Sequence, residues 1–238
     1  MGRATKTTSI HRKFGEAAGH NINPALEILR EKPLHTVALS QLRCTQITVG
    51  MRQSEHKQEK IHDLSKRPGE LLEYLLQHPI RVVLGPDGHA YVIDHHHLAL
   101  ALVNEGYETV PMVVEEDFSG LAKGRTAKEA MEKFWQKMEA KKYVHPFDEN
   151  GKRRAISAIP KKLTDLKDDP YRSLAGFARE AGAFNKVMTP FAEFEWADYF
   201  RSRIPEKLVR KNFDKALDMA IELAHEAAAK KLPGFTPG

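Results

Sequence analysis

The sequence predicts an α+β protein in which a small mixed sheet with helices is followed by a mainly helical C-terminal region. Short β-prone runs alternate with helical patterns over residues 34–117, and turn residues separate two of these runs. The last third of the chain has helical periodicity interrupted by prolines. We therefore expect an α+β domain over 31–118, a helical domain over 119–238 and a flexible basic arm over 1–30.

The first half of the α+β domain is expected to contain one strand and two helices. Residues 34–43 alternate apolar and polar side chains, as a half-buried strand does. A helix is expected to begin with Ser54 as its N-cap, because serine accepts a hydrogen bond from the first free amides. A second helix, Glu70–Gln77, follows the break at Pro68-Gly69 and places its leucines on one side.

The second half of this domain is expected to contain a hairpin, a helix and a strand. The β-prone runs 81–84 and 90–93 flank Gly85-Pro86-Asp87-Gly88, which is typical of a hairpin turn. A helix then follows three consecutive histidines and ends at Gly106. Residues 109–115 form the last expected strand of the domain.

The C-terminal region is expected to consist of helices. Residues 126–142 form a charged amphipathic pattern, and residues 162–231 form a helical region in which prolines mark breaks or first turns. Arg172 and Arg179 fall seven residues apart on one helix face, where they either approach an anion bound by the first domain or lie on the surface. Glu195 and Asp198 lie on neighbouring turns and are a weaker candidate for metal binding.

Composition narrows the function only slightly. The chain has 238 residues, 41% hydrophobic content and no apolar run as long as a membrane span. Its one cysteine, Cys44, excludes an internal disulfide and a cysteine-based zinc site, and it favours a reducing compartment, so we expect a cytoplasmic protein. The net charge of +5 is spread among 32 acidic residues and allows binding to a polyanion without requiring it.

The most informative segment is Asp94-His95-His96-His97, which lies between a buried strand and a helix. Asp94 is the expected N-cap. This arrangement directs backbone N–H groups and imidazoles to one point, where the helix dipole favours an anion such as phosphate. Two other interpretations remain open. Asp94 with one or two histidines would bind a divalent metal, or the histidines would only satisfy groups at the helix start.

The pattern at 91–102 resembles the phosphate-binding turn of the ParB/sulfiredoxin superfamily. The upstream order of Leu42–Gln46, then Arg52, then Glu59–Leu64 is similar to the strand, arginine turn and helix of that superfamily. Residues 166–177 and 191–198 extend the likeness to the subgroup called "Putative ParB-like nuclease".

The resemblance implies a site for the phosphates of ATP, ADP or CTP, usually with Mg²⁺. The superfamily includes a nucleotide-gated DNA clamp, ATP-dependent sulfinic-acid reductases and free-serine kinases. Carried over to this chain, the resemblance implies a set of residues that bind the phosphate or nucleotide: Arg52, Lys60, Asp94, His95, His96 and His97. The catalytic candidates are His96 and His97 as hydrogen-bond or proton donors, and Glu55 or Glu59 as the general base.

The chain also departs from the superfamily pattern. Glycine is usual at or next to position 95, and arginine is usual in the slot of His97 or Leu98. The sulfiredoxin cysteine is absent, which argues against reductase activity, and no basic helix-turn-helix follows the turn.

These observations favour a nucleotide- or phosphate-binding enzyme that carries out phosphoryl transfer or nucleotide hydrolysis. One alternative is a ParB-like nuclease acting on DNA or RNA, and another is a non-catalytic module that binds a partner protein. The expected partner is a nucleotide or a phosphorylated small molecule, nucleic acid is the alternative, and no membrane is expected. The sequence assigns neither a metal site nor an oligomeric state.

Overall fold

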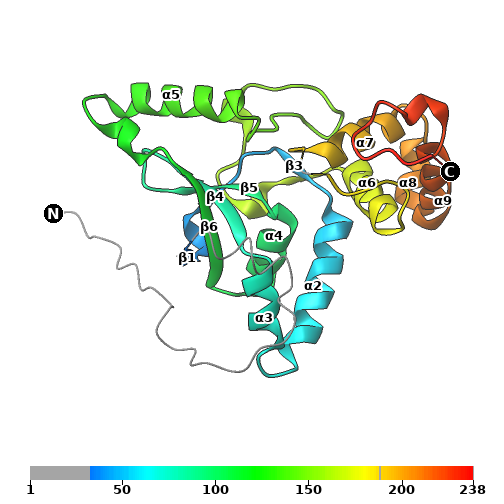
Figure 1. The fold of residues 1–238 in the computed structure, drawn as a ribbon, viewed down its shortest axis with the longest axis horizontal. Helices are drawn as coiled ribbons and strands as arrows, with labels where there is room; N and C mark the ends of the chain where they lie inside the picture. The colour runs from blue at the N-terminus through cyan, green and yellow to red at the C-terminus, as the bar shows by residue number, and fades with distance from the viewer. Residues whose placement is uncertain (1–32, 188, 238) are drawn as a thin grey trace.

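A five-stranded mixed sheet forms the centre of the first part of the molecule, in the order β1-β6-β4-β5-β2 (Figure 1). The structure is a computed structural model that describes residues 33–187 and 189–237, so the arm expected at 1–30 lies outside the described residues. The strands are β1 (Leu34–Ala38), β2 (Leu42–Arg43), β4 (Ile80–Leu84), β5 (Ala90–Asp94) and β6 (Thr109–Asp117). Strands β4 and β5 form the expected antiparallel hairpin, whereas β4 pairs with β6 in parallel. The predicted α+β class with a mixed sheet is confirmed.

The prediction of one strand over 34–43 was wrong. The segment contains β1, a 3₁₀ turn at Leu39–Gln41 and β2. The two strands lie at opposite edges of the sheet, because β1 pairs with β6 and β2 pairs with β5. The chain therefore has to leave one edge and cross to the other, and Leu39 is buried in the turn that makes this crossing.

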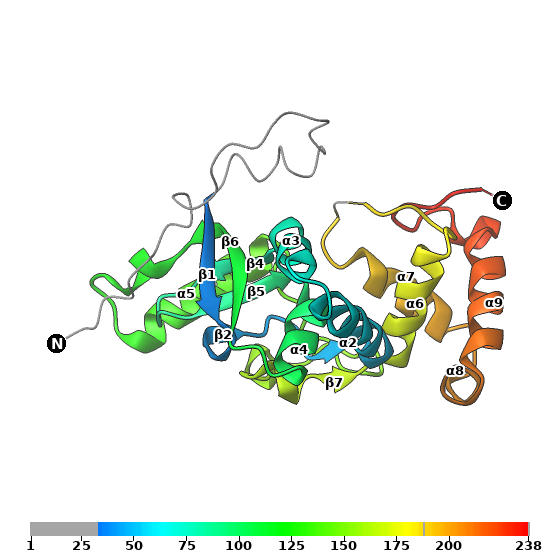
Figure 2. The ribbon, with the colours of Figure 1, turned by 90° about the horizontal axis from the view of Figure 1, so that it is seen from below.

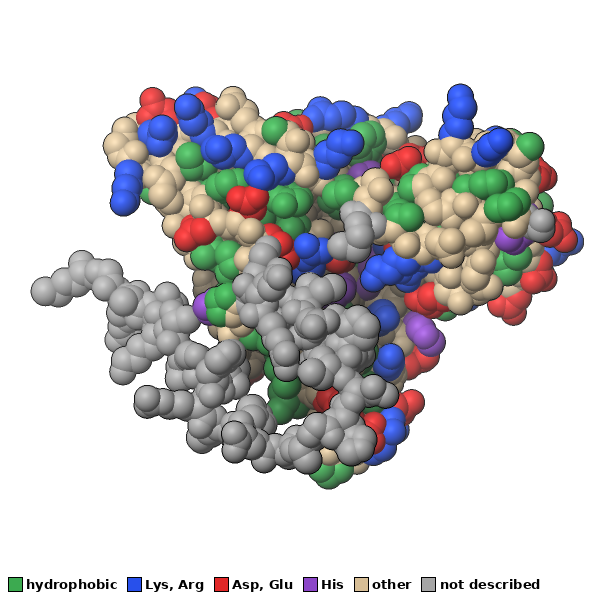
Figure 3. All heavy atoms as spheres, in the orientation of Figure 1, with side chains coloured by type: hydrophobic (Ala, Val, Ile, Leu, Met, Phe, Trp, Pro, Cys, Tyr) green, Lys and Arg blue, Asp and Glu red, His purple; other side chains and the backbone are tan. Residues whose placement is uncertain are grey.

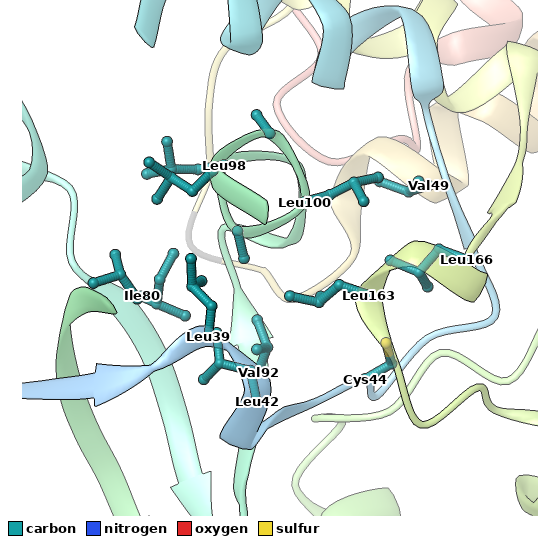
Figure 4. Close-up of a cluster of buried hydrophobic side chains, with 14 of the residues drawn as sticks. Leu39, Leu42, Cys44, Val49, Ile80, Val92, Leu98, Leu100, Leu163 and Leu166 are labelled. Carbon is teal, nitrogen blue, oxygen red and sulfur yellow. The ribbon is translucent and has the colours of Figure 1, made fainter. Parts of the chain in front are cut away.

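Three helices pack in this part of the molecule: α2 (Met51–Ser65), α3 (Glu70–Gln77) and α4 (His96–Asn104). Helix α4 is buried on several sides, so Leu98 points toward Ile80 of the sheet while Leu100 points toward Val49 (Figure 4). Leu163 and Leu166 belong to the same core, although they follow the expected boundary at residue 118. That boundary stays a prediction.

The prediction that Ser54 caps a helix was wrong, because α2 begins at Met51 and Gly50 is its N-cap. The first amides of α2 instead donate hydrogen bonds to acceptors that lie far away along the chain. The N–H of Gly50 donates to His97 Nε2 at 3.2 Å, and the N–H of Met51 donates to Asp168 Oδ1 at 3.0 Å. Glycine is required at position 50, since a Cβ atom there would lie 2.6 Å from the Ser173 hydroxyl oxygen.

The remaining described chain forms a long helix and a helical lobe (Figures 1 and 2). Helix α5 (Ala127–Ala140) follows the sheet and buries Phe134 and Met138 against Val83 and Tyr91. Short strands β3 (Thr48–Val49) and β7 (Lys167–Asp168) pair in parallel and join the two parts of the chain. The lobe has its own core and contains α6 (Pro170–Glu180), α7 (Ala192–Arg201), α8 (Glu206–Lys211) and α9 (Phe213–Ala224). None of the helices in the described part of the chain is both long and apolar enough to span a membrane.

Candidate functional site

The histidine turn joins β5 to α4 through a left-handed residue. His95 has φ 69° and ψ 29° and is the N-cap of α4, and no side chain in the described residues caps this helix. The prediction of Asp94 as N-cap was therefore wrong. Asp94 is the last residue of β5, and its carboxylate accepts the His95 N–H at 2.7 Å. This hydrogen bond, with the nearby His95 ring and Arg81, outweighs burial and lowers the pKa of Asp94.

The three histidines have different environments. His95 Nδ1 lies 2.9 Å from the carbonyl oxygen of Pro79, so Nδ1 carries the proton and Nε2 is left as an acceptor. His96 is 4% exposed, and its Nε2 lies 3.4 Å from the hydroxyl oxygen of Thr45. His97 Nε2 accepts the amide of Gly50. Each histidine therefore has one ring nitrogen without a hydrogen-bond partner among the described residues, Nε2 in His95 and Nδ1 in His96 and His97, and His95 Nε2 lies 4.0 Å from Asp94 Oδ2.

Burial keeps the second and third histidines neutral. It lowers the pKa of His96 to about 3 and lowers the pKa of His97 well below its ordinary value. In both cases the charge of Arg172 adds to the effect. Neutral imidazoles in fixed positions anchor the turn to Thr45 and Gly50.

Two arginines of α6 face this turn. The Arg172 side chain is 11% exposed and donates from Nη1 to Gln53 Oε1 at 2.7 Å. Glu193 of α7 lies between the arginines, 3.8 Å from Arg172 Nη2 and 3.4 Å from Arg179 Nη1. The Nε–H groups of both arginines are buried and have no hydrogen-bond partner among the described residues. Each arginine therefore retains a donor for a further acceptor.

Helix α2 connects the arginines to the turn. Ser54 donates its hydroxyl to the His97 carbonyl oxygen at 3.2 Å, while the neighbouring Gln53 holds Arg172. Gln53 fits against α6 because position 176 is glycine, where a Cβ atom would meet the Gln53 amide at 1.9 Å. One turn later, Lys57 lies near Arg179, and burial lowers the pKa of its ammonium group. Basic and histidine side chains gather where the sheet body meets the helical lobe (Figure 3).

A second helix also begins beside the arginines from a left-handed residue. Phe191, with φ 60°, is the N-cap of α7, and no described side chain caps that helix. The Arg172 guanidinium lies 5.3 Å from the Phe194 ring, on which His145 stacks with a centroid distance of 3.8 Å. Burial lowers the pKa of His145 to about 3, and Arg172 contributes to this shift.

Four residues predicted from the resemblance lie on the exposed surface of α2. The Arg52 guanidinium lies 4.2 Å from the centre of the Phe213 ring, and Lys60 Nζ lies 4.5 Å from the Tyr74 ring. Glu55 is exposed, and exposed Glu59 lies 3.8 Å from His56 Nδ1. The contacts to the turn and arginines come instead from other positions of α2, and the roles expected for these four residues stay predictions.

Two residues of this site, Gln53 and Lys57, were not predicted from the sequence, and the sequence left the role of Arg172 and Arg179 open. A signal was present, because Gly50, Gln53, Ser54 and Lys57 follow the spacing of one helix face. However, this face carries few apolar residues, so periodicity did not mark it as an interface.

No group of three potential ligands in residues 33–187 and 189–237 is arranged to hold a metal ion. Asp198 forms an ion pair with Arg201 at 3.3 Å, and Glu195 is exposed. Cys44 is buried, and burial raises the pKa of its thiol to about 12, so this cysteine is not an activated nucleophile.

The fold and turn define a class of protein: a mixed sheet whose strand–histidine–helix turn faces basic residues from a following helical lobe. The family model described as "Putative ParB-like nuclease" matches residues 35–202, so the chain belongs to this family, as the sequence pattern predicts. The crystal structure of protein Atu1540 from Agrobacterium tumefaciens is similar over 86% of this chain and 98% of that chain, with 41% identity and a TM-score of 0.74. No curated protein matches.

Proposed function

We propose that the histidine turn and the arginines of α6 bind a phosphate group of a small ligand, and that the protein transfers or hydrolyses that group. The observation that carries this proposal is the pair of buried Nε–H donors of Arg172 and Arg179 beside the uncapped start of α4. Guanidinium groups and helix N-terminal amides are both suited to phosphate oxygens.

A nucleotide such as ATP, ADP or CTP is the first candidate ligand. Arg172 and Arg179 would neutralise the phosphate charge, and Lys57 would add a third cation from α2. Mg²⁺ usually binds through phosphate oxygens and one or two carboxylates, so it would enter with the nucleotide. Its chemistry would be to neutralise charge that develops on the transferred group.

His95 is the best-placed general base. The Pro79 carbonyl oxygen fixes a proton on Nδ1, and Nε2, which lies 4.0 Å from Asp94 Oδ2, would accept a proton from water or from a hydroxyl group. His96 and His97 have ring nitrogens already engaged with Thr45 and Gly50. We therefore assign them to positioning the turn, while His95 receives the proton.

A nuclease is the second candidate, and the family match supports it. In that case the same turn would act on a phosphodiester of DNA or RNA. The two functions differ in what they consume, because the first releases phosphate or transfers it from a nucleotide and the second shortens a polynucleotide.

The test is thermal unfolding with ATP, ADP, CTP, GTP and inorganic phosphate, each with and without Mg²⁺. A ligand at about 100 times its dissociation constant stabilises a protein by roughly 2.7 kcal/mol. For a chain of this size that corresponds to a rise in Tm of about 5–10 °C. The variant is Arg179→Gln, and the matched control is Arg67→Gln, which removes one positive charge from an exposed ion pair with Glu70.

A rise in Tm that Arg67→Gln retains and Arg179→Gln loses would support the site. Absence of a rise with every ligand would contradict it. Turnover is then measured as phosphate release and as cleavage of labelled DNA and RNA, using His95→Gln to test the base. A ligand that binds without any turnover would leave a non-catalytic binding protein.

A further inference from the structure

Positive charge is concentrated in one segment of the chain. Residues 119–167 contain thirteen Lys and Arg against six Asp and Glu, a net charge of +7. Residues 33–118 have a net charge of −5, and residues 168–238 have none. The overall charge of +5 therefore conceals a strongly basic segment beside an acidic one.

All of these basic side chains are exposed. They are Lys123, Arg125, Lys128, Lys133, Lys137, Lys141, Lys142, Lys152, Arg153, Arg154, Lys161, Lys162 and Lys167. We call them the basic surface. In the space-filling view, blue side chains follow α5 and continue over the segment after it (Figure 3).

Few of these charges are neutralised within the described chain. Lys141, Arg153 and Arg154 form ion pairs with Glu116, Glu139 and Asp148, respectively. The other ten have no acidic partner within 4.0 Å among the described residues. Two of the six acidic residues of the segment bind backbone amides, since Glu129 closes the capping box of α5 and Asp148 accepts amides of its own turn.

The basic surface has an extended shape. Lys133, Lys137 and Lys141 follow one another at four-residue intervals, so they form a line along one side of α5. The helix has 14 residues and is therefore about 21 Å long. That length covers roughly six successive phosphates of a duplex strand, which lie about 3.4 Å apart along its axis.

We propose that the basic surface binds the phosphodiester backbone of a nucleic-acid duplex. Single strands are usually held by base stacking on exposed aromatic rings, and membranes by apolar side chains. The only large hydrophobic residue that is exposed in the described chain is Leu72, which lies on α3. Protein interfaces also require an apolar centre and are depleted in lysine. This binding is independent of the phosphate site proposed above.

The test measures fluorescence anisotropy of labelled 20-base-pair DNA and RNA duplexes at several salt concentrations. The variant is the triple substitution Lys133→Gln, Lys137→Gln and Lys161→Gln. The matched control is Lys207→Gln, Lys211→Gln and Lys215→Gln, three exposed lysines of the helical lobe. Both triples remove the same charge, and circular dichroism checks that both fold.

The full-length protein is expected to bind a duplex with a dissociation constant that rises steeply with salt. The basic-surface triple is expected to weaken binding at least tenfold and to reduce the slope of log K against log salt by up to about three. The control triple is expected to change binding less than twofold. Comparing the two duplexes shows whether the backbone is DNA or RNA.

Three results would overturn the proposal. They are no duplex binding at low salt, an equal loss in both triples, and preferential binding to phosphatidylserine vesicles that the basic-surface triple abolishes. The nucleotide-dependent rise in Tm is measured on the same triple, where it should persist. A failure of the basic surface is thereby distinguished from a failure of the phosphate site.

Discussion

Helices α4 and α7, which begin beside the histidine turn and the arginines, start differently from helices α5 and α9. Helices α4 and α7 start from left-handed His95 and Phe191, and no described side chain caps either of them. Helix α5 has a complete capping box at Thr126 and Glu129, and α9 is capped by Asn212. The first amides of α4 and α7 therefore remain without a capping side chain, whereas α5, α9 and the arginine helix α6 use a side chain of their own to cap theirs.

This difference has an energetic meaning. A left-handed conformation costs a residue with a side chain roughly 1–3 kcal/mol, whereas a good cap contributes about 1 kcal/mol. At α4 and α7 the protein bears the cost of a left-handed residue and lacks the stabilisation that a cap would contribute. Such strain is typical of sites that bind a ligand, because a helix start filled by its own side chain has no donors left for an anion.

The largest expected effect comes from Asp169, the cap that fixes the arginine helix α6. Its carboxylate is 1% exposed, accepts the amides of Tyr171 and Arg172, and lies 2.8 Å from Arg201 Nη2. Asp169→Ala leaves the amides of Tyr171 and Arg172 without their acceptor and leaves Arg201 with only exposed Asp198 and the Glu149 carbonyl oxygen as acceptors in the described chain, so we expect the free energy of unfolding in urea to fall by about 3–5 kcal/mol. Asp169→Asn, which retains the amide acceptor, should lose less. A loss below about 1 kcal/mol in Asp169→Ala would contradict this role of Asp169.

The second expected effect is a loss of stability in weak acid. The pKa values of His96 and His145 are lowered to about 3 in the folded state, whereas an unfolded histidine has a pKa of about 6.5. The unfolded chain therefore binds more protons, so stability is present above about pH 6.5 and is lost as the pH falls toward 3. Each such histidine should contribute about 1.4 kcal/mol per pH unit.

His145→Phe tests this pH dependence at one position. No described residue forms a hydrogen bond with the His145 side chain, and its ring stacks near Phe147 and Phe194. A phenylalanine should preserve the stacking and remove one titrating group. Urea unfolding between pH 6.5 and 4.5 should then become less steep in pH, and an unchanged slope would show that His145 does not titrate in this way.

Local patterns predicted the elements whose ends are decided locally. The hairpin around Gly85 and Gly88 and the helix Glu70–Gln77 were predicted correctly, because turn residues and apolar spacing determine them. The caps of α2 and α4 could not be found in this way. Met51 donates to Asp168, which is 117 residues further along the chain, and Gly50 donates to His97. Tertiary packing brings these acceptors to the start of α2, and no local sequence motif predicts which distant residues they are.

The sequence likewise predicted the separate parts of the candidate site but not how they come together. The histidine turn and the shared face of Arg172 and Arg179 follow from strand and helix periodicity. That α6 meets the turn depends on close packing against α2, where Gly50 and Gly176 leave room for Ser173 and Gln53. Spacing along one helix cannot show which other helix will face it.

A third prediction concerns the strain at the start of α4. His95→Ala retains a Cβ atom at φ 69°, while His95→Gly removes it, and both lose the hydrogen bond to Pro79. We expect the glycine variant to be more stable than the alanine variant by about 1–2 kcal/mol. Urea unfolding measures the difference. Equal stabilities would mean that the left-handed residue carries no cost and that the comparison between the helix starts fails on this side.

The smallest expected effect is at the capped helix. The Thr126 hydroxyl oxygen accepts the Glu129 amide at 3.3 Å, and the Glu129 carboxylate accepts the Thr126 amide at 2.9 Å. Thr126→Ala should lower the free energy of unfolding by about 1 kcal/mol. Because α5 begins beside Pro86 and Asp87 of the hairpin turn, at the opposite end of β5 from the histidine turn, this variant should leave any nucleotide-dependent rise in Tm intact. Loss of that rise would show that the start of α5 and the phosphate site are coupled, so that a capped helix start is not purely structural.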